Sequence, residues 1–261
     1  MLKKLLVGCA CLLLTVQGAW ALTITNDGST IWSDNFESGT VGEKPSGWDA
    51  FSRDDLTTVE SSAGANQGTK YLEIRRADGV LDGEISARFA SQSSGTVTAD
   101  FAVYLPSNGD KGSATRVAFS QGGNDPSECC EVSARHMYLM TGNWGSLGAN
   151  ANDVVAAFHQ GSYQYLSNVC VGCADTWVDV SLTQSTQTGA GSEPVITMNG
   201  TIVNTYPFQN GKGAIDGLNF GMNSASGGLA RIDAIPEPTT VALLLMGIGS
   251  LLAFARGRNT I

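Results

Sequence analysis

The chain has 261 residues, of which 32 are glycine and 15% are charged, and its formal net charge is −9 at pH 7. An acidic surface repels phosphate backbones, so nucleic acid is excluded as an expected partner. Abundant glycine between short apolar runs favours strands and turns over helices, and the chain is long enough for one β-sandwich domain.

The N-terminus has the pattern of a secretory signal peptide. Two lysines open the chain, an apolar run follows over residues 5–16, and Ala19 and Ala21 form an A-x-A cleavage site. We expect export through the Sec translocon and removal of residues 1–21. A lipoprotein cleavage site at Cys9 is the alternative, but the apolar run between Lys4 and this site would be too short for the apolar core of a signal peptide.

Residues 22–234 are expected to fold as one all-β domain. Apolar residues occupy every second position from Val97 to Leu105, and the same alternation recurs over residues 178–182. This period predicts half-buried strands. Shorter strands are expected over residues 70–75, 85–89, 116–120, 132–140, 154–159 and 218–222.

Residues 195–203 predict a tight hairpin. Asn199 and Gly200 both accept the positive φ angles of a type I′ turn, so the two flanking runs can pair directly. The register would place Met198 opposite Thr201.

Four cysteines remain once the signal peptide is removed, as two close pairs: Cys129 with Cys130, and Cys170 with Cys173. Export places them in an oxidising compartment, where disulfides persist. Adjacent cysteines rarely bridge each other, so we expect two bridges between the pairs, in either register. Each would close a loop of about 40 residues and contribute about 2–4 kcal/mol. A four-thiolate zinc site and a redox Cys-x-x-Cys are the alternatives.

The C-terminus combines three features in order: Pro236, Glu237 and Pro238, then an apolar segment over residues 239–255, then a basic end. The apolar segment is expected to span a membrane once, with the C-terminus in the cytoplasm and the domain outside. Residues 235–261 thereby resemble the PEP-CTERM sorting signal. This resemblance implies cleavage by a membrane-embedded exosortase and delivery to the cell surface or extracellular matrix. A plain single-pass anchor is the alternative.

The exported part resembles the concanavalin A-like (laminin-G or glucanase-type) jelly-roll sandwich. The resemblance depends on segment 34–37 with Gly47 and Trp48 soon after, on the late hairpin and on the closing segment 230–235. It implies an antiparallel jelly-roll-like β-sandwich whose first and last strands lie together. An immunoglobulin-like sandwich or a related carbohydrate-binding jelly roll is the alternative.

The same resemblance implies a candidate structural calcium site where the ends of the domain meet. Calcium takes oxygen ligands, and the carboxylates brought together there would be Asp34, Glu37 and Asp233. Solvated acidic residues at strand ends are the alternative.

Catalytic residues are not assigned. Glucanases of this fold carry Glu-x-Asp-x-x-Glu on one strand, whereas Glu84 and the acidic residues before it lie in a Gly-rich turn here. A polysaccharide lyase would use Tyr or His as a base and Arg or Asn to neutralise the uronate. Arg135, however, would face away from His136 and Tyr138.

Glycan binding is expected instead, because sugar sites combine aromatic platforms with amides. Trp32 and Trp48 are expected to pack in the core or at an edge. The expected ligand-binding residues lie in the long loop region between the cysteine pairs: Asn143, Trp144, Tyr163 and Tyr165. The chain is thus predicted to be an exported surface or matrix protein that binds, or forms part of, extracellular polysaccharide. A lyase or glycoside hydrolase of the same fold is the alternative.

Overall fold

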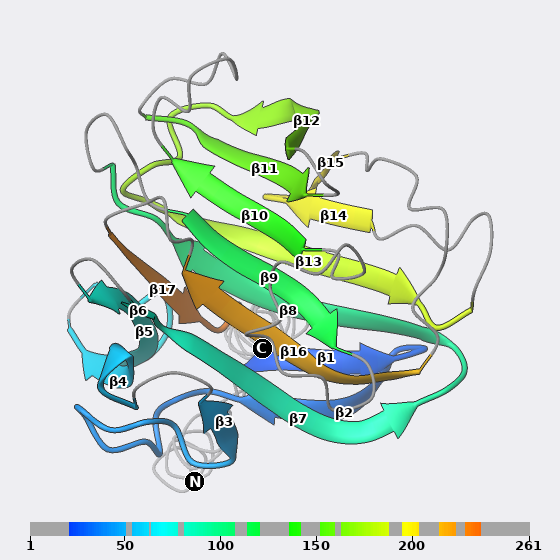
Figure 1. Cartoon of the computed structure of the whole chain (residues 1–261), viewed down its shortest axis with the longest axis horizontal. Helices are drawn as coiled ribbons and strands as arrows, with labels where there is room; N and C mark the ends of the chain where they lie inside the picture. Colours follow the sequence, from blue (N-terminus) through cyan, green and yellow to red (C-terminus); the bar gives the residue numbers. More distant parts are fainter. Residues whose placement is uncertain are drawn as a thin grey trace, which may run out of the picture.

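The computed structural model of the chain describes residues 21–50, 54–62, 64–77, 81–107, 114–120, 136–141, 152–159, 163–187, 195–203, 214–222 and 228–235. These residues form two antiparallel sheets of ten and seven strands that lie one over the other as a sandwich (Figure 1). The expected all-β, jelly-roll-like sandwich is therefore confirmed. Within these ranges the one helical element is the 3-10 turn η1 (Asp54–Leu56).

The ten-stranded sheet contains both ends of the domain and the late hairpin. Its main path runs β15 (Thr201–Val203), β14 (Val195–Met198), β13 (Trp177–Ser185), β8 (Thr96–Tyr104), β17 (Leu229–Asp233), β5 (Lys70–Ala77) and β4 (Thr57–Ser61). Three further strands pair beside this path: β1 (Leu22–Asn26), β2 (Ser29–Asp34) and β6 (Leu81–Asp82).

The seven-stranded sheet lies in front in Figure 1. Its order is β12 (Tyr163–Cys170), β11 (Val154–His159), β10 (His136–Thr141), β9 (Ala114–Ser120), β16 (Ile215–Met222), β7 (Glu84–Gln92) and β3 (Trp48–Ala50).

One edge of β8 holds both ends of the domain. β1 pairs with residues 97–100 of β8, and β17 pairs with residues 102–104. The end of β17 therefore meets the start of β1, and Ala21 forms an antiparallel bridge with Ile235. The expected meeting of the first and last strands is confirmed.

The core lies between the two sheets and follows the predicted alternation. In β8, Val97, Ala99, Phe101 and Val103 are fully buried and face the second sheet. The rings of Phe101 and Phe220 meet edge to face with centroids 5.1 Å apart, and this contact joins β8 to β16 across the sandwich.

The late hairpin has the expected turn. Asn199 and Gly200 have φ angles of 47° and 75°, as a type I′ turn requires, and Met198 lies opposite Thr201.

Several predicted features lie outside the described residues: Ala19 and the rest of the signal peptide up to Trp20, Cys129, Cys130, Asn143, Trp144, and the sorting motif Pro236, Glu237 and Pro238 with the apolar segment 239–255. In the ranges given above, no helix has both the length and the apolar character needed to cross a bilayer.

Candidate functional site

Asp34, one of the three carboxylates expected to bind calcium, has protein partners. Its Oδ2 accepts a hydrogen bond from Nε1 of Trp48 at 2.7 Å, and its Oδ1 accepts one from the backbone amide of Phe36 at 2.8 Å. Asp34 therefore fixes the indole of Trp48 at the edge of the core.

Glu37 also has protein partners. Its Oε1 accepts hydrogen bonds from the backbone amides of Thr69 and Lys70 at 2.7 and 2.8 Å, and its Oε2 accepts one from Thr69 Oγ1 at 2.9 Å. Partial burial alone would raise the pKa of Glu37, but these hydrogen bonds outweigh it and hold the pKa below its ordinary value.

Asp233 is fully buried at the end of β17. Its Oδ2 accepts a hydrogen bond from the Gln67 amide at 2.9 Å, and its Oδ1 accepts one from the Ala234 amide at 2.7 Å. Burial raises the pKa of Asp233 to about 6, and the negative charge of Glu37 adds to this shift. All three carboxylates thus accept hydrogen bonds from protein groups, and the calcium site stays a prediction. In the part of the chain that the structure describes, no three metal-ligating side chains form a group that could hold an ion.

The buried carboxyl of Asp233 predicts a pH-dependent stability. Its folded pKa of about 6 lies above the unfolded value of about 3.9, so folding favours the protonated form. Its contribution to the free energy of unfolding is fully present below about pH 4 and is lost as the pH rises through about 6, by up to about 3 kcal/mol.

Urea unfolding of the wild type and of Asp233→Asn between about pH 4 and 7.5 measures this contribution as the difference between the two proteins. Other carboxylates such as Glu37 titrate in the opposite sense but are present in both. The wild type should lose stability relative to the variant as the pH rises. Equal pH profiles would show that Asp233 does not titrate in this window.

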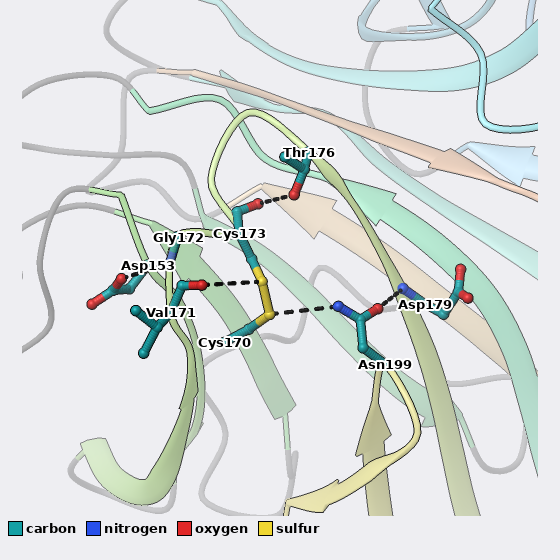
Figure 2. Close-up of a disulfide and its surroundings, with 8 residues drawn as sticks. All are labelled: Asp153, Cys170, Val171, Gly172, Cys173, Thr176, Asp179 and Asn199. Atoms are coloured by element: carbon teal, nitrogen blue, oxygen red, sulfur yellow. Dashed lines mark hydrogen bonds between the residues drawn. A yellow bond between two sulfur atoms is a disulfide. The ribbon is translucent and has the colours of Figure 1, made fainter.

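The disulfide in the structure joins Cys170 to Cys173 (Figure 2), so the expected bridges from these two residues to Cys129 and Cys130 are corrected. Directly adjacent cysteines rarely bridge each other for geometric reasons, but this restriction does not hold for Cys170 and Cys173, which are three residues apart. Gly172, with a φ of 71°, turns the chain directly after β12 and brings the two Cα atoms to 5.5 Å. This distance suits a disulfide, for which about 4.4–6.8 Å is usual.

The disulfide turn packs against the late hairpin. Asn199 donates through Nδ2 to Sγ of Cys170 at 3.6 Å, and its Oδ1 accepts from the Asp179 amide at 2.9 Å (Figure 2). On the other side, the Gly172 amide donates to Oδ1 of Asp153 at 2.9 Å. The bridge therefore orders a turn between β12 and β13.

A short-range bridge predicts a modest stability effect. For so small a loop, the chain-entropy contribution is about 2 kcal/mol, less than a bridge across about 40 residues would give. The double variant Cys170→Ala/Cys173→Ala should lose no more than this in urea unfolding, with the remaining thiols counted in the same preparation. A loss near 4 kcal/mol would indicate a long-range bridge instead.

The outer face of the seven-stranded sheet carries several buried polar side chains, and we call four of them the polar face: Glu84 and Ser86 from β7, Arg116 from β9 and Asn219 from β16. Their exposed fractions are 7%, 0%, 6% and 8%. They alternate along their strands with core residues such as Ile85, Val117 and Phe220. Buried charged residues are rare and normally paired, so this burial requires an explanation.

Arg116 and Glu84 form an ion pair across β16. Gly221 lies between them, opposite Arg116 on one side and Glu84 on the other. A Cβ atom at Gly221 would lie 2.9 Å from Nη2 of Arg116 and 3.2 Å from Cγ of Glu84. The absence of a side chain at Gly221 therefore gives the guanidinium room to reach the carboxylate.

Asn219 lies in β16 opposite Ser86 and Ala118. Its Oδ1 is buried and has no hydrogen-bond partner among the residues that the structure describes. Such a group costs about 1–3 kcal/mol, and native proteins normally satisfy it with protein, water or ligand. Oδ1 of Asn219 is therefore a buried acceptor for which the described residues supply no donor.

A second arginine lies beside the polar face, near β3. Arg88 pairs with Asp49 at 3.5 Å and with Asp216 at 3.8 Å, and it donates through Nη1 to Ser120 Oγ at 3.2 Å. Arg88 and Arg116 thus both have carboxylate partners, so neither guanidinium carries an uncompensated charge.

Beyond β9, the seven-stranded sheet continues through β10 and β11 to β12. Across the strands, Arg116 pairs with Tyr138, Tyr138 with Ala157, and Ala157 with Tyr165. Two residues along β10, His136 pairs with His159, which in turn pairs with Tyr163. Tyr163 and Tyr165 were expected in a loop, and the structure places them in strand β12. They share the sheet of the polar face.

The sequence did not identify the polar face. Glu84 was assigned to a Gly-rich turn, but it begins β7 and pairs with Arg116. The alternation over 84–88 and 116–120 could have placed both residues on one face. It could not show their burial, which depends on neighbouring strands distant in sequence.

Comparison with known proteins gives a sorting motif and a fold. Residues 234–259 match the PEP-CTERM protein-sorting motif, and no curated protein matches the chain significantly. The alginate lyase Aly36B is 12% identical with a TM-score of 0.51, over 82% of this chain and 95% of that chain. The Emp47p carbohydrate recognition domain is 12% identical with a TM-score of 0.44, over 83% and 93%. A sialidase is 11% identical with a TM-score of 0.47, over 82% of this chain but 18% of its own.

The sorting motif implies an exported exosortase substrate, and the likeness to solved structures shows a jelly-roll β-sandwich fold. The motif indicates a surface protein that is anchored in a membrane before its tail is cleaved. At 12% identity the likeness to the lyase shows the fold alone.

Proposed function

We propose that the protein, once exported and sorted to the cell surface or matrix, binds extracellular polysaccharide through the polar face. The observation that supports this proposal is the buried Oδ1 of Asn219, for which the described part of the chain provides no donor. A sugar hydroxyl can donate to this oxygen and accept from the guanidinium of Arg116 in the same site. A hydroxyl-rich chain therefore supplies the partner that Asn219 lacks.

Because Arg88 and Arg116 are paired with carboxylates, recognition depends on hydroxyl groups more than on acidic charge. Electrophoresis of the full protein through gels containing laminarin, hydroxyethyl cellulose or alginate tests this. At least one neutral glycan should retard the wild type. Asn219→Leu, which keeps the volume and removes the amide, should run unretarded.

Ser181→Ala in β13, on the other sheet, is the matched control and should be retarded like the wild type. Loss of retardation in both variants would place the site elsewhere. If no polysaccharide retards the wild type, glycan binding is wrong and a structural role in the matrix would be the better proposal.

A polysaccharide lyase is the second candidate, and the register of β9 and β10 favours it. A lyase needs Tyr or His as a base and Arg or Asn to neutralise the uronate. In the ladder Tyr138 lies opposite Arg116, and His136 lies two residues before Tyr138 on the same strand. Incubation with alginate should then produce unsaturated ends that absorb ultraviolet light, and Tyr138→Phe, which removes the hydroxyl of the candidate base, should abolish them. No such product would exclude alginate lyase activity and leave binding untouched.

A further inference from the structure

The outer face of the ten-stranded sheet carries a cluster of aromatic rings around an arginine, on the side of the sandwich opposite the polar face. We call its four members the arginine cage: Tyr71 from β5, Tyr104 from β8, Trp177 from β13 and Arg231 from β17. In the ladder, Tyr104 pairs with Arg231 on one side and with Trp177 on the other. Three adjacent strands therefore present large side chains at the same level of the sheet.

Arg231 is held with its guanidinium against two tyrosine rings. Its Cζ lies 5.1 Å from the ring centroid of Tyr71 and 5.0 Å from that of Tyr104. Its Nε donates to Oε2 of Glu73 at 3.0 Å, and the side chain of Glu73 is only 5% exposed. The ring contacts and the ion pair together fix the plane of the guanidinium before a ligand arrives.

The Nη groups of Arg231 remain for a ligand. The described residues provide a hydrogen-bond acceptor for its Nε alone, and its side chain is 26% exposed. A guanidinium fixed in this way offers two parallel N–H donors, which is the geometry that a carboxylate accepts. Arg75, the other arginine partner of Glu73, differs because its Nη2 already lies 3.4 Å from Oε1 of Glu60.

Trp177 supplies an aromatic surface in the same cluster. Its ring centroid lies 5.7 Å from that of Tyr104 and 6.2 Å from that of Tyr71, and its Nε1 donates to the Gly64 carbonyl at 2.8 Å. The indole is thus fixed in place while it stays only half-buried. Sugars pack their apolar faces on such rings, and a uronate sugar also carries a carboxylate.

We propose that the arginine cage is a second glycan site, which binds a uronate of an acidic polysaccharide by its carboxylate on Arg231 and its sugar ring on Trp177. A peptide carboxylate would satisfy the guanidinium but would bring no sugar ring to the indole. The proposal rests on the proposed function for its ligand class, glycan, and not for its location. With sites on opposite faces, one molecule can join two polysaccharide chains.

Electrophoresis of the full protein through gels with increasing alginate measures this site. Salt at about 0.15 M screens the general repulsion between the acidic protein and the polymer. Arg231→Lys keeps the charge but removes the paired donors, so its Kd for alginate should rise at least about tenfold. Arg75→Lys, the same substitution at the other partner of Glu73, is the matched control and should bind like the wild type.

The ligand has a matched control as well. Alginate whose carboxylates have been reduced to alcohols should retard the wild type and Arg231→Lys alike. Wild-type affinity for alginate in Arg231→Lys would overturn the proposal. An equal loss in Arg75→Lys would also overturn it, because charge alone would then explain the binding.

Trp177→Leu tests the indole and covers the case in which Arg231→Lys does not fold, which circular dichroism detects. It should weaken binding to alginate several-fold, and unchanged affinity in this variant would overturn the role of the ring and with it the uronate site.

The two glycan sites fail separately. Asn219→Leu leaves the arginine cage intact, so alginate should still retard it although neutral glycans do not. A wild type retarded by neutral glycans but not by alginate would overturn the arginine cage and leave the polar face. A wild type retarded by alginate alone would overturn the polar face and support the cage.

Discussion

Trp48→Ala is expected to lower the free energy of unfolding by about 3–5 kcal/mol. Trp48 is 2% exposed, and its ring lies between Phe36, which follows β2, and Phe220 of β16. Its ring centroid is 5.1, 5.8 and 6.2 Å from those of Trp32, Phe36 and Phe220. Alanine would remove these contacts together and leave a cavity that the rigid sheets on either side cannot close.

Trp48→Phe is the matched variant, because it keeps an aromatic ring and removes the Nε1–H that donates to Asp34. The loss should be smaller, about 1–3 kcal/mol for a carboxylate left without its donor together with the smaller ring. Urea unfolding followed by circular dichroism measures both variants. If Trp48→Ala cost no more than Trp48→Phe, the ring packing would contribute little and the hydrogen bond to Asp34, which both variants lack, would account for the loss.

Local patterns in the sequence predicted local structure well. The alternation in residues 96–105 identified β8, and the Asn199 and Gly200 turn fixed the register of its hairpin, because both depend on neighbouring residues alone. The sheet order could not be predicted in the same way. β8 lies between β13 on one edge and β1 with β17 on the other, and pairings between such distant segments leave no local pattern.

The candidate site was harder to predict, since its groups depend on which distant segment comes close. Whether Glu37 binds a cation or two amides is decided by residues 69–70, which the fold brings next to it. Likewise, the partner of Cys170 is decided by the turn at Gly172. The sorting motif, by contrast, is contiguous, and the sequence alone identified it.

Arg116→Met is expected to destabilise the domain by about 3–5 kcal/mol. The substitution keeps most of the side-chain length and removes the charge, so it leaves the carboxylate of Glu84 buried beside β16 without its cation. Glu84→Gln should cost less than this, because the guanidinium can still donate to the amide oxygen.

The double variant Glu84→Gln/Arg116→Met separates the ion pair from the rest of the fold. It should recover part of the loss caused by Arg116→Met, since no unpaired carboxylate remains, and the double-mutant cycle should give a coupling above about 1 kcal/mol. Additive losses in urea unfolding would mean that the two residues do not act as a pair. Removing both charges of a buried ion pair changes stability little. A double variant that folds but no longer binds glycan would therefore show that the ion pair of Glu84 and Arg116 serves recognition.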